Sequence, residues 1–271
     1  DLKRTPGGSS SGSAAAVADR MVPIAIGSQT TGSIIRPASY CGIYGYKPTY
    51  GLISRYGALH LSRRLDHVGL LARSLEDIAL VADQLMEFDP RDPDMRPGLG
   101  LSLLESFFQK PSATPHLAFV RTSVWDHTDE DARLAYESFV KRMGQIVEEV
   151  ELPPTFDQAV ECHTTIYDAG IAERFTEVYE HESARISAYF RGRLEKGGQI
   201  LAANYIQALQ LADNFNQVLN GIFERYEAIL TPAAPSEAPL GPDATGRAIF
   251  SVIWTLCGTP TVTVPILECG R

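Results

Sequence analysis

Apolar residues along this chain gather into two kinds of segment. Short apolar runs are typical of buried strands, and longer stretches with apolar residues three or four positions apart are typical of helices. The first pattern predicts strands at Pro23–Ser28, Ile43–Tyr46, Leu117–Arg121, Val147–Leu152, Ala228–Thr231 and Thr261–Pro265. The second predicts helices at Ser13–Arg20, Gly32–Tyr40, Leu75–Met86, Asp129–Ile146 and Ala248–Leu256, and a nearly continuous helical block at Phe156–Glu227. Because strands alternate with helices, we expect an α/β fold with an inner sheet covered on both faces.

We expect one domain, residues 1–271, that carries a helical lobe at residues 156–227. Two of its helices have an N-cap signal. Ser74 is followed three residues later by Asp77, and this spacing is typical of a capping box. Thr128 stands just before the helix expected at Asp129–Ile146, and we expect it to be the N-cap there.

Composition and charge argue against several classes of partner. The 271 residues are 44% apolar and carry a net charge of −9, with no basic cluster beyond Arg63–Arg64, so nucleic acid is not expected as a direct partner. No apolar run approaches the roughly 20 residues of a membrane span, and no signal peptide opens the chain, so a membrane is not expected either. The four cysteines lack CxxC spacing, which favours buried free thiols in a reducing cytoplasm; they are Cys41, Cys162, Cys257 and Cys269.

The segment Pro6–Pro37 is rich in Ser, Gly and Ala. Such a segment could be a flexible linker, a phosphate-binding loop or an active site. It holds neither a phosphate-binding GxxxxGK[ST] loop nor a GxGxxG motif. It also lacks the GxSxG nucleophile elbow, because Thr31 stands two positions before Ser33. A flexible linker is disfavoured by the strand-like run VPIAIGS in its middle.

Three neighbouring motifs carry a resemblance to a known family. They are GGSSSGSAAAVA, GSQTTGSIIRPASYCG and GYKPTYG, and the stretches Ser54–Ser74, ILTPAAP and GTPTVTVP continue them. Together they resemble the amidase signature family, whose members are Ser–Ser–Lys amide hydrolases. The resemblance implies a central mixed, twisted sheet covered by helices, a small-molecule amide as substrate, and neither cofactor nor metal.

The resemblance also implies the roles of individual residues. It places the nucleophile at Ser33, and at Ser9 a bridging serine that relays protons and follows a cis peptide bond. It builds the oxyanion hole from the backbone N–H groups of Thr30, Thr31, Gly32 and Ser33. This division of roles is chemically sensible, because a serine hydroxyl needs a base and a developing oxyanion needs donors already in place.

The family's base is a neutral lysine that lies well upstream of the first serine block. Lys3 is too close to Ser9 to take that position, and Lys47 belongs to the KPT motif, for which we expect a packing or turn role. We therefore expect the catalytic lysine to lie outside this chain, the chain to be a fragment at both ends, and the fragment alone to be inactive. Two further departures are Thr31 and Ser11, which stand where many members have Gly.

Arg36 follows Ser33 by three residues and has two interpretations. Its guanidinium could bind a substrate carboxylate, or it could pair with Asp66 as part of the scaffold. Gln29 opens the block Gln-Thr-Thr-Gly-Ser, which resembles the stand-alone small-amide hydrolases more than the amidotransferase A subunits.

Other polar pairs are weaker candidates for a site. Asp66 and His67 suggest a Ser/His/Asp triad, but the family has no catalytic His there. Cys162 and His163 are neighbours in an expected helix and therefore point to different faces, which disfavours a metal site or a Cys/His pair. We expect Cys41 to be a small packed residue.

Three functions stay open. The first is a stand-alone cytoplasmic amidase, which the Gln29 block favours. The second is the A subunit of a glutamyl/aspartyl-tRNA amidotransferase, which is a glutaminase that works in a complex. The third is a non-catalytic binding member, against which the intact Ser9 and Ser33 argue. The amide substrate is not readable from the sequence, and a homodimer stays open as the oligomeric state.

Overall fold

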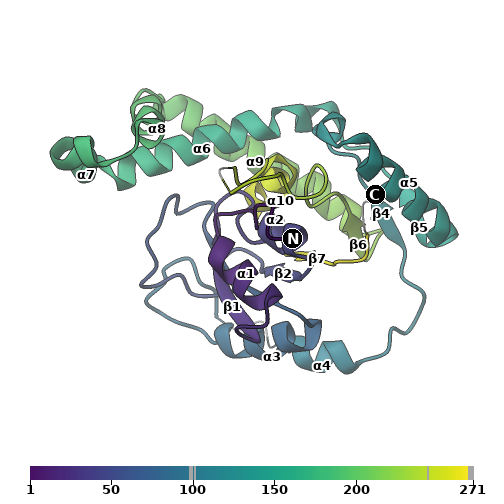
Figure 1. Cartoon of the computed structure of the whole chain (residues 1–271). Coiled ribbons are helices and arrows are strands. Elements are labelled where there is room, and N and C mark those ends of the chain that lie inside the picture. The colour runs from purple at the N-terminus through teal and green to yellow at the C-terminus, as the bar shows by residue number, and fades with distance from the viewer. Residues whose placement is uncertain (98–99, 101, 243, 268–271) are drawn as a thin grey trace.

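The computed structural model describes residues 1–97, 100, 102–242 and 244–267, so Cys269 lies outside the described residues. Its strands form two sheets (Figure 1). The larger is antiparallel, with the order β1 (Ile24–Gln29), β3 (His67–Ala72), β2 (Tyr44–Lys47) and β7 (Thr261–Thr263). The smaller is parallel, with the order β5 (Val147–Glu149), β4 (Leu117–Phe119) and β6 (Ala228–Leu230).

The α/β class is confirmed, but the strands do not join into the single mixed sheet that we expected. The edge strands β6 and β7 line a cavity of about 550 Å³ together, and no pairing between them is present among the described residues. The described residues therefore form one antiparallel and one parallel sheet.

Strand β3 is an element that the apolar pattern does not predict. It lies between β1 and β2, pairing Gln29 with His67 on one side and Tyr44 with Ala72 on the other. Gly69 interrupts its apolar run, and the backbone needs that glycine because a Cβ there would lie 2.2 Å from Tyr46 O. A short, fully buried run of this kind shows no alternation of polar and apolar residues by which to recognise it.

Both faces of the larger sheet are covered by helices, as expected. Leu71 of β3 packs on one face with Ala14 and Ile34, which belong to α1 (Ser11–Ala18) and the start of α2 (Ile35–Cys41). Leu70 and Ala72 point to the other face and pack with Ile78 of α3 (Leu75–Leu85). Alternate residues of one strand therefore hold two helical layers.

The remaining helices complete the molecule. They are α4 (Leu103–Phe108), α5 (Glu130–Met143), α6 (Ala159–Arg174), α7 (Thr176–Glu182), α8 (Ala188–Gly198), α9 (Ala202–Phe223) and α10 (Val252–Leu256), with short 3-10 helices at Trp125–His127, Gly144–Ile146, Pro154–Gln158, Ser183–Arg185 and Ile249–Ser251. The capping box is confirmed, since Ser74 Oγ accepts from Asp77 N at 3.0 Å. The N-cap at Thr128 is wrong: α5 begins at Glu130 with Asp129 before it. Across the described residues, no helix combines the length and apolar character that crossing a membrane requires.

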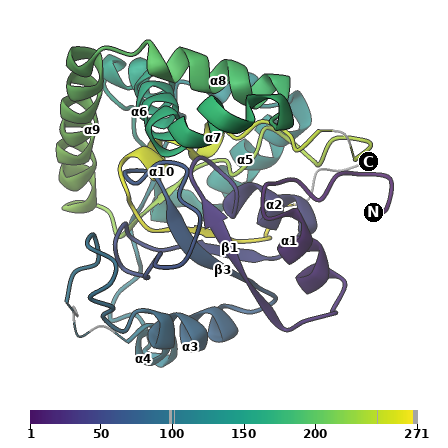
Figure 2. The same ribbon diagram turned by 90° about the vertical axis from the view of Figure 1, so that its left-hand side faces the viewer.

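The expected helical block is confirmed as a set of helices, α6 to α9, which lie on the opposite side of the molecule from α3 and α4 (Figures 1 and 2). The block is joined to the rest by a common apolar cluster. Phe156 and Phe215 from the block pack there with Leu65 and Trp254. The block therefore packs against α10 and the segment just before β3.

A buried ion-pair network ties the loop after β2 to the loop after α3. The Arg55 guanidinium, 2% exposed, binds Asp92 at 2.9 Å and Asp94 at 2.5 Å, and it also donates to Arg63 O. These bonds outweigh the effect of burial and raise the pKa of Arg55. The same bond from Arg55 holds the pKa of Asp92 well below its ordinary value, and bonds from Arg63 and Arg55 lower the pKa of Asp94 to about 2.

We expect Arg55→Met to lower the free energy of unfolding by about 3–5 kcal/mol, because it leaves Asp92 buried without its cation. Chemical denaturation at pH 7 measures this. Arg64→Met is the matched control: Arg64 meets Asp213 at 3.4 Å on the surface, and its loss should cost less than about 1 kcal/mol.

The two carboxylates also predict how stability depends on pH. Their pKa values are lower in the folded chain than the value of about 3.9 in an unfolded chain. Their contribution is therefore complete above about pH 4 and is lost as the pH falls toward 2. Arg55→Met should lose less stability than wild type over this range, and an equal loss would contradict the network's role.

Candidate active site

The two serine blocks meet at a backbone hydrogen bond. Ser10 N donates to Ser33 O at 3.2 Å, at the point where the chain enters α1 and approaches α2. The peptide bond between Gly8 and Ser9 is cis, as the resemblance implies. Ser9 is exposed and Ser33 half-buried. The structure thus brings the two serine blocks together, with Ser9 next to the residue that bonds Ser33 O.

The carbonyl groups of the loop between β1 and α2 are all held by other parts of the chain. Thr30 O accepts from His163 Nε2 at 2.9 Å, and Thr31 O accepts from Thr255 Oγ1 at 2.6 Å. Gly32 O accepts from Arg36 N at 3.0 Å as the first turn of α2 forms. The donors come from α6, α10 and α2, so three separate elements fix one short loop.

The N–H groups of the same loop are in the opposite situation. Within the described residues, the N–H groups of Thr31, Gly32 and Ser33 have no hydrogen-bond acceptor. The C=O and the following N–H of a trans peptide point in opposite directions. The carbonyl contacts therefore direct these N–H groups away from His163, Thr255 and α2, as an oxyanion hole requires.

Thr31 fits the loop without backbone strain. Among the described residues, Arg20 is the only non-glycine residue with a positive φ, so Thr31 does not need the left-handed conformation. Gly32 is more constrained: a Cβ there would lie 3.1 Å from Ser251 Oγ and 3.2 Å from Ala248 Cβ. A β-branched residue is therefore acceptable at the first position, and close packing favours glycine at the second.

Gln29, at the end of β1, connects the loop to its supports. Its side chain is buried, and Oε1 accepts from the N–H groups of Ile34 and Ile35 at 2.8 and 3.0 Å. Its Nε2 donates to Thr255 Oγ1 at 2.9 Å. Gln29 thus satisfies the free N–H groups where α2 starts and orients the threonine that holds Thr31 O.

Arg36 is buried, and its guanidinium binds backbone carbonyls. Nε and Nη2 donate to Gly8 O, and Nη1 donates to Gly246 O. Asp66, the expected scaffold partner, instead accepts from Thr30 Oγ1 at 2.7 Å and from Ser62 N at 3.1 Å. These contacts favour a scaffold role for Arg36, with carbonyls in place of Asp66, and its binding of substrate stays a prediction.

Lys47 is the buried lysine nearest in sequence to the serine blocks. Its Nζ donates to Thr259 O at 2.5 Å and to Pro48 O at 3.4 Å. Complete burial lowers its pKa to about 7. The side chain therefore ties the end of β2 to the turn before β7, which is the packing role expected of the KPT motif. Lys3 is exposed.

The two weaker candidate pairs, Asp66 with His67 and Cys162 with His163, form neither a catalytic triad nor a metal site among the described residues. Asp66 binds Thr30, and His67 Nδ1 contacts Leu65 O at 2.7 Å. Cys162 Sγ donates to Ala208 O, whereas His163 contacts Thr30 O in the loop between β1 and α2. Burial lowers the pKa of His163 to about 4, so its ring is neutral.

His163 and Thr255 are the site residues that sequence reasoning missed. In the sequence, His163 stands out only as the neighbour of Cys162, and Thr255 belongs to none of the recognised motifs. Both side chains are buried and polar inside helices, which is the one signal that they need a specific partner.

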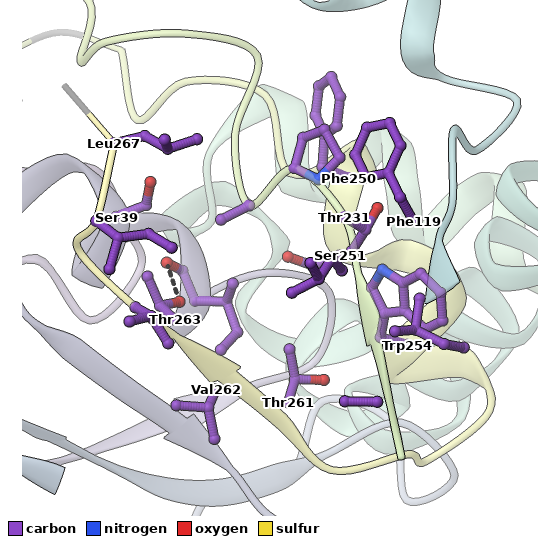
Figure 3. Close-up of a pocket in the computed structure, with 18 of the residues that line it drawn as sticks. Ser39, Phe119, Thr231, Phe250, Ser251, Trp254, Thr261, Val262, Thr263 and Leu267 are labelled. Carbon is purple, nitrogen blue, oxygen red and sulfur yellow. Dashed lines mark hydrogen bonds between the residues drawn. The ribbon is translucent and has the colours of Figure 1, made fainter. Parts of the chain in front are cut away.

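The cavity of about 550 Å³ is a separate feature of the molecule. Figure 3 shows Phe119, Phe250, Trp254 and Thr263 around it, and neither Ser9 nor Ser33 lines it. A second cavity of about 420 Å³ is lined by Tyr40, His127 and Arg247 among others, and again not by the two serines. The candidate site is therefore defined by the serines and the loop, and not by either of these two cavities.

Comparison with known proteins identifies the family to which this chain is similar. A family model described as "Amidase" matches residues 1–268. The glutamyl-tRNA(Gln) amidotransferase A subunit of Clostridium botulinum (strain Alaska E43 / Type E3) is 34% identical over all of this chain and 62% of its own length. The corresponding protein of Chlamydia trachomatis serovar L2 (strain ATCC VR-902B) is 32% identical over 98% of this chain and 60% of its own length. The chain thus spans about three fifths of these relatives.

Solved structures agree with this result. A chain from a vestigial protein complex that reveals the origins of an s-triazine catabolic enzyme has a TM-score of 0.87 and 26% identity, covering 97% of this chain and 59% of its own. The glutamyl-tRNA(Gln) amidotransferase A subunit of Thermotoga maritima has a TM-score of 0.83 and 30% identity, covering 97% of this chain and 60% of its own. With a family match over nearly its whole length, the chain belongs to the amidase family.

Proposed function

We propose that the protein hydrolyses a carboxylic amide to an acid and ammonia or an amine through an acyl-serine intermediate. Ser33 is the nucleophile and Ser9 the proton relay. The observation that carries this proposal is the loop that ends at Ser33. Its carbonyls accept hydrogen bonds from other parts of the chain, while the N–H groups of Thr31, Gly32 and Ser33 find no acceptor in the part of the chain that the structure describes. The bond between Ser10 N and Ser33 O keeps the relay serine next to that loop.

The reaction follows from these positions. Ser33 Oγ attacks the amide carbon and passes its proton to Ser9 Oγ, which passes its own proton to the base. The carbonyl oxygen becomes an oxyanion and accepts from the N–H groups of Thr31, Gly32 and Ser33, with Thr30 at the edge of the loop. When the intermediate collapses, the C–N bond breaks and the proton returns through Ser9 to the leaving nitrogen. Water then cleaves the acyl-serine along the same route.

We place the base, a lysine kept neutral by its surroundings, outside the residues of this chain. Lys47 is held by the carbonyls of Thr259 and Pro48, and Lys3 is exposed. Neither lysine has a contact with Ser9 among the described residues. The free thiols of Cys41, Cys162 and Cys257 agree with a cytoplasmic enzyme.

The second candidate is an amidotransferase A subunit that uses glutamine and passes ammonia to a partner on tRNA. The observation that favours it is the name of the curated relatives, which are glutamyl-tRNA(Gln) amidotransferase A subunits. The Gln29 block favours the stand-alone amidase instead, and we propose the latter. The substrate in either case is a small molecule.

A fluorophosphonate probe on the protein at its natural length tests the nucleophile. We expect a covalent adduct on Ser33, none in Ser33→Ala, and a rate of adduct formation at least about 10³-fold lower in Ser9→Ala, because the relay of the proton is lost. Mass spectrometry of the intact protein and its peptides measures both.

Ser28→Ala is the matched control, since Ser28 is an exposed serine on β1, five residues before Ser33. Its adduct rate should equal that of wild type. A wild type that forms no adduct, or forms it equally in Ser33→Ala, would contradict the assignment and favour a non-catalytic member of the family.

Ammonia release separates the two candidate functions. The purified protein alone should release ammonia from small aliphatic or aryl amides, because a stand-alone amidase needs no partner. An enzyme-coupled ammonia assay over an amide panel that includes glutamine measures this. Release from glutamine alone, and only when B and C subunits copurify, would instead establish the amidotransferase role.

A further inference from the structure

We propose that His163 and Thr255 are positioning residues that set the oxyanion hole by holding the carbonyl groups of Thr30 and Thr31. This inference rests on the proposed amide hydrolysis. It adds one residue from α6 and one from α10 to the supports of residues 30–33, which we call the nucleophile loop. Neither residue lies in the serine motifs.

His163 fixes the first peptide. Its Nε2 lies 2.9 Å from Thr30 O, and a carbonyl can only accept, so Nε2 carries the proton. The ring is neutral because it is fully buried, and one N–H is then its whole supply of donors. With Thr30 O held by His163, the Thr31 N–H of the same peptide points away from His163, to the side where we place the oxyanion.

The orientation of the His163 ring is itself set by the lobe. Tyr167, one turn further along α6, stacks on it with ring centroids 6.1 Å apart and an interplanar angle of 17°. The guanidinium of Arg193, on α8, lies over the Tyr167 ring at 4.7 Å from its centroid. The same guanidinium forms an ion pair with Asp168. Packing inside the lobe therefore reaches the nucleophile loop through one imidazole.

Thr255 fixes the second peptide through a chain of hydrogen bonds that can run in one direction only. The N–H groups of Ile34 and Ile35 donate to Gln29 Oε1, so the Gln29 amide must present Nε2 to Thr255. Thr255 Oγ1 accepts that bond and gives its single proton to Thr31 O at 2.6 Å. The Gly32 N–H consequently points away from Thr255.

Loss of either donor leaves a buried carbonyl without a partner. Rotation of the peptide toward another donor relieves this, and the rotation carries the N–H out of the hole. Since one oxyanion donor is worth a factor of about 10²–10³ in rate, each substitution should be visible in the chemistry of Ser33.

The test measures the second-order rate of fluorophosphonate labelling of Ser33 in the protein at its natural length. We expect His163→Leu and Thr255→Val to lower the rate about 10²–10³-fold. His163→Gln and Thr255→Ser, which keep a donor near the same position, should stay within about tenfold of wild type. Thr164→Val is the matched control on α6: Thr164 is exposed and donates only to Val160 O within its own helix, so its rate should not change.

Two outcomes overturn the inference. One is labelling of His163→Leu and Thr255→Val at the wild-type rate. The other is a failure of His163→Gln and Thr255→Ser to restore the rate when their thermal unfolding matches that of wild type, because a purely structural role would not distinguish donors from isosteric non-donors.

A crystal structure of His163→Leu separates this inference from the proposed function. If wild type is not labelled, the proposed function is wrong, and the structure still decides the positioning role. A rotated Thr30–Thr31 peptide supports it, and an unchanged peptide with Thr30 O unpartnered contradicts it.

Discussion

The backbone hydrogen bond from Ser10 N to Ser33 O joins two segments that the chain separates by a helix and a strand. It forms because α1 returns the chain over the sheet, and small side chains such as Ala14 let that helix approach Leu71 and Ile34 closely. Arg36 then holds Gly8 O from the first turn of α2, so each serine block supports the other. The rest of the site is built on this junction, because it decides where the nucleophile loop faces.

Around the junction, the backbone carbonyl groups and N–H groups of the loop have different hydrogen-bonding needs. A loop whose N–H groups stay free must still satisfy its carbonyls, since buried polar groups without partners are costly. Here the carbonyls accept from an imidazole, a hydroxyl and a helix N–H, and Gln29 fixes which way the hydroxyl points. Each of these donors has one proton to give in its position, so each of these hydrogen bonds can run only from the donor to the loop carbonyl. The preformed oxyanion hole that we propose would therefore depend on the supports behind the loop and not on the loop sequence alone.

The difference between the loop and its distant supports explains what could be predicted from the sequence. Signals that act over a few residues were recognised: the Ser74 capping box, most strands, the lobe helices and the two serine blocks. Contacts between distant residues were not, because nothing local in α6 or α10 indicates that His163 and Thr255 reach the same loop. Strand β3 escaped for a related reason, since burial on both faces removes the polar alternation that marks a strand. Thr128 shows the reverse error, where a favourable local residue stands one position too early and Asp129 takes the N-cap position.

The three buried cations of this region show why a shifted pKa does not by itself identify a base. Arg55 lies between Asp92 and Asp94, which raise its pKa, and it holds loops together as an ion pair. Arg36 and Lys47 donate to backbone carbonyls and have no carboxylate partner among the described residues, so burial lowers the pKa of both, that of Lys47 to about 7. A lysine with that pKa could accept a proton at neutral pH, which is the property that a serine relay needs. Yet Lys47 Nζ is directed at Thr259 O and Pro48 O, and a base must lie within hydrogen-bond reach of the proton that it removes. Geometry therefore outweighs the pKa, and the contacts of Lys47 are those of a residue that holds the fold together.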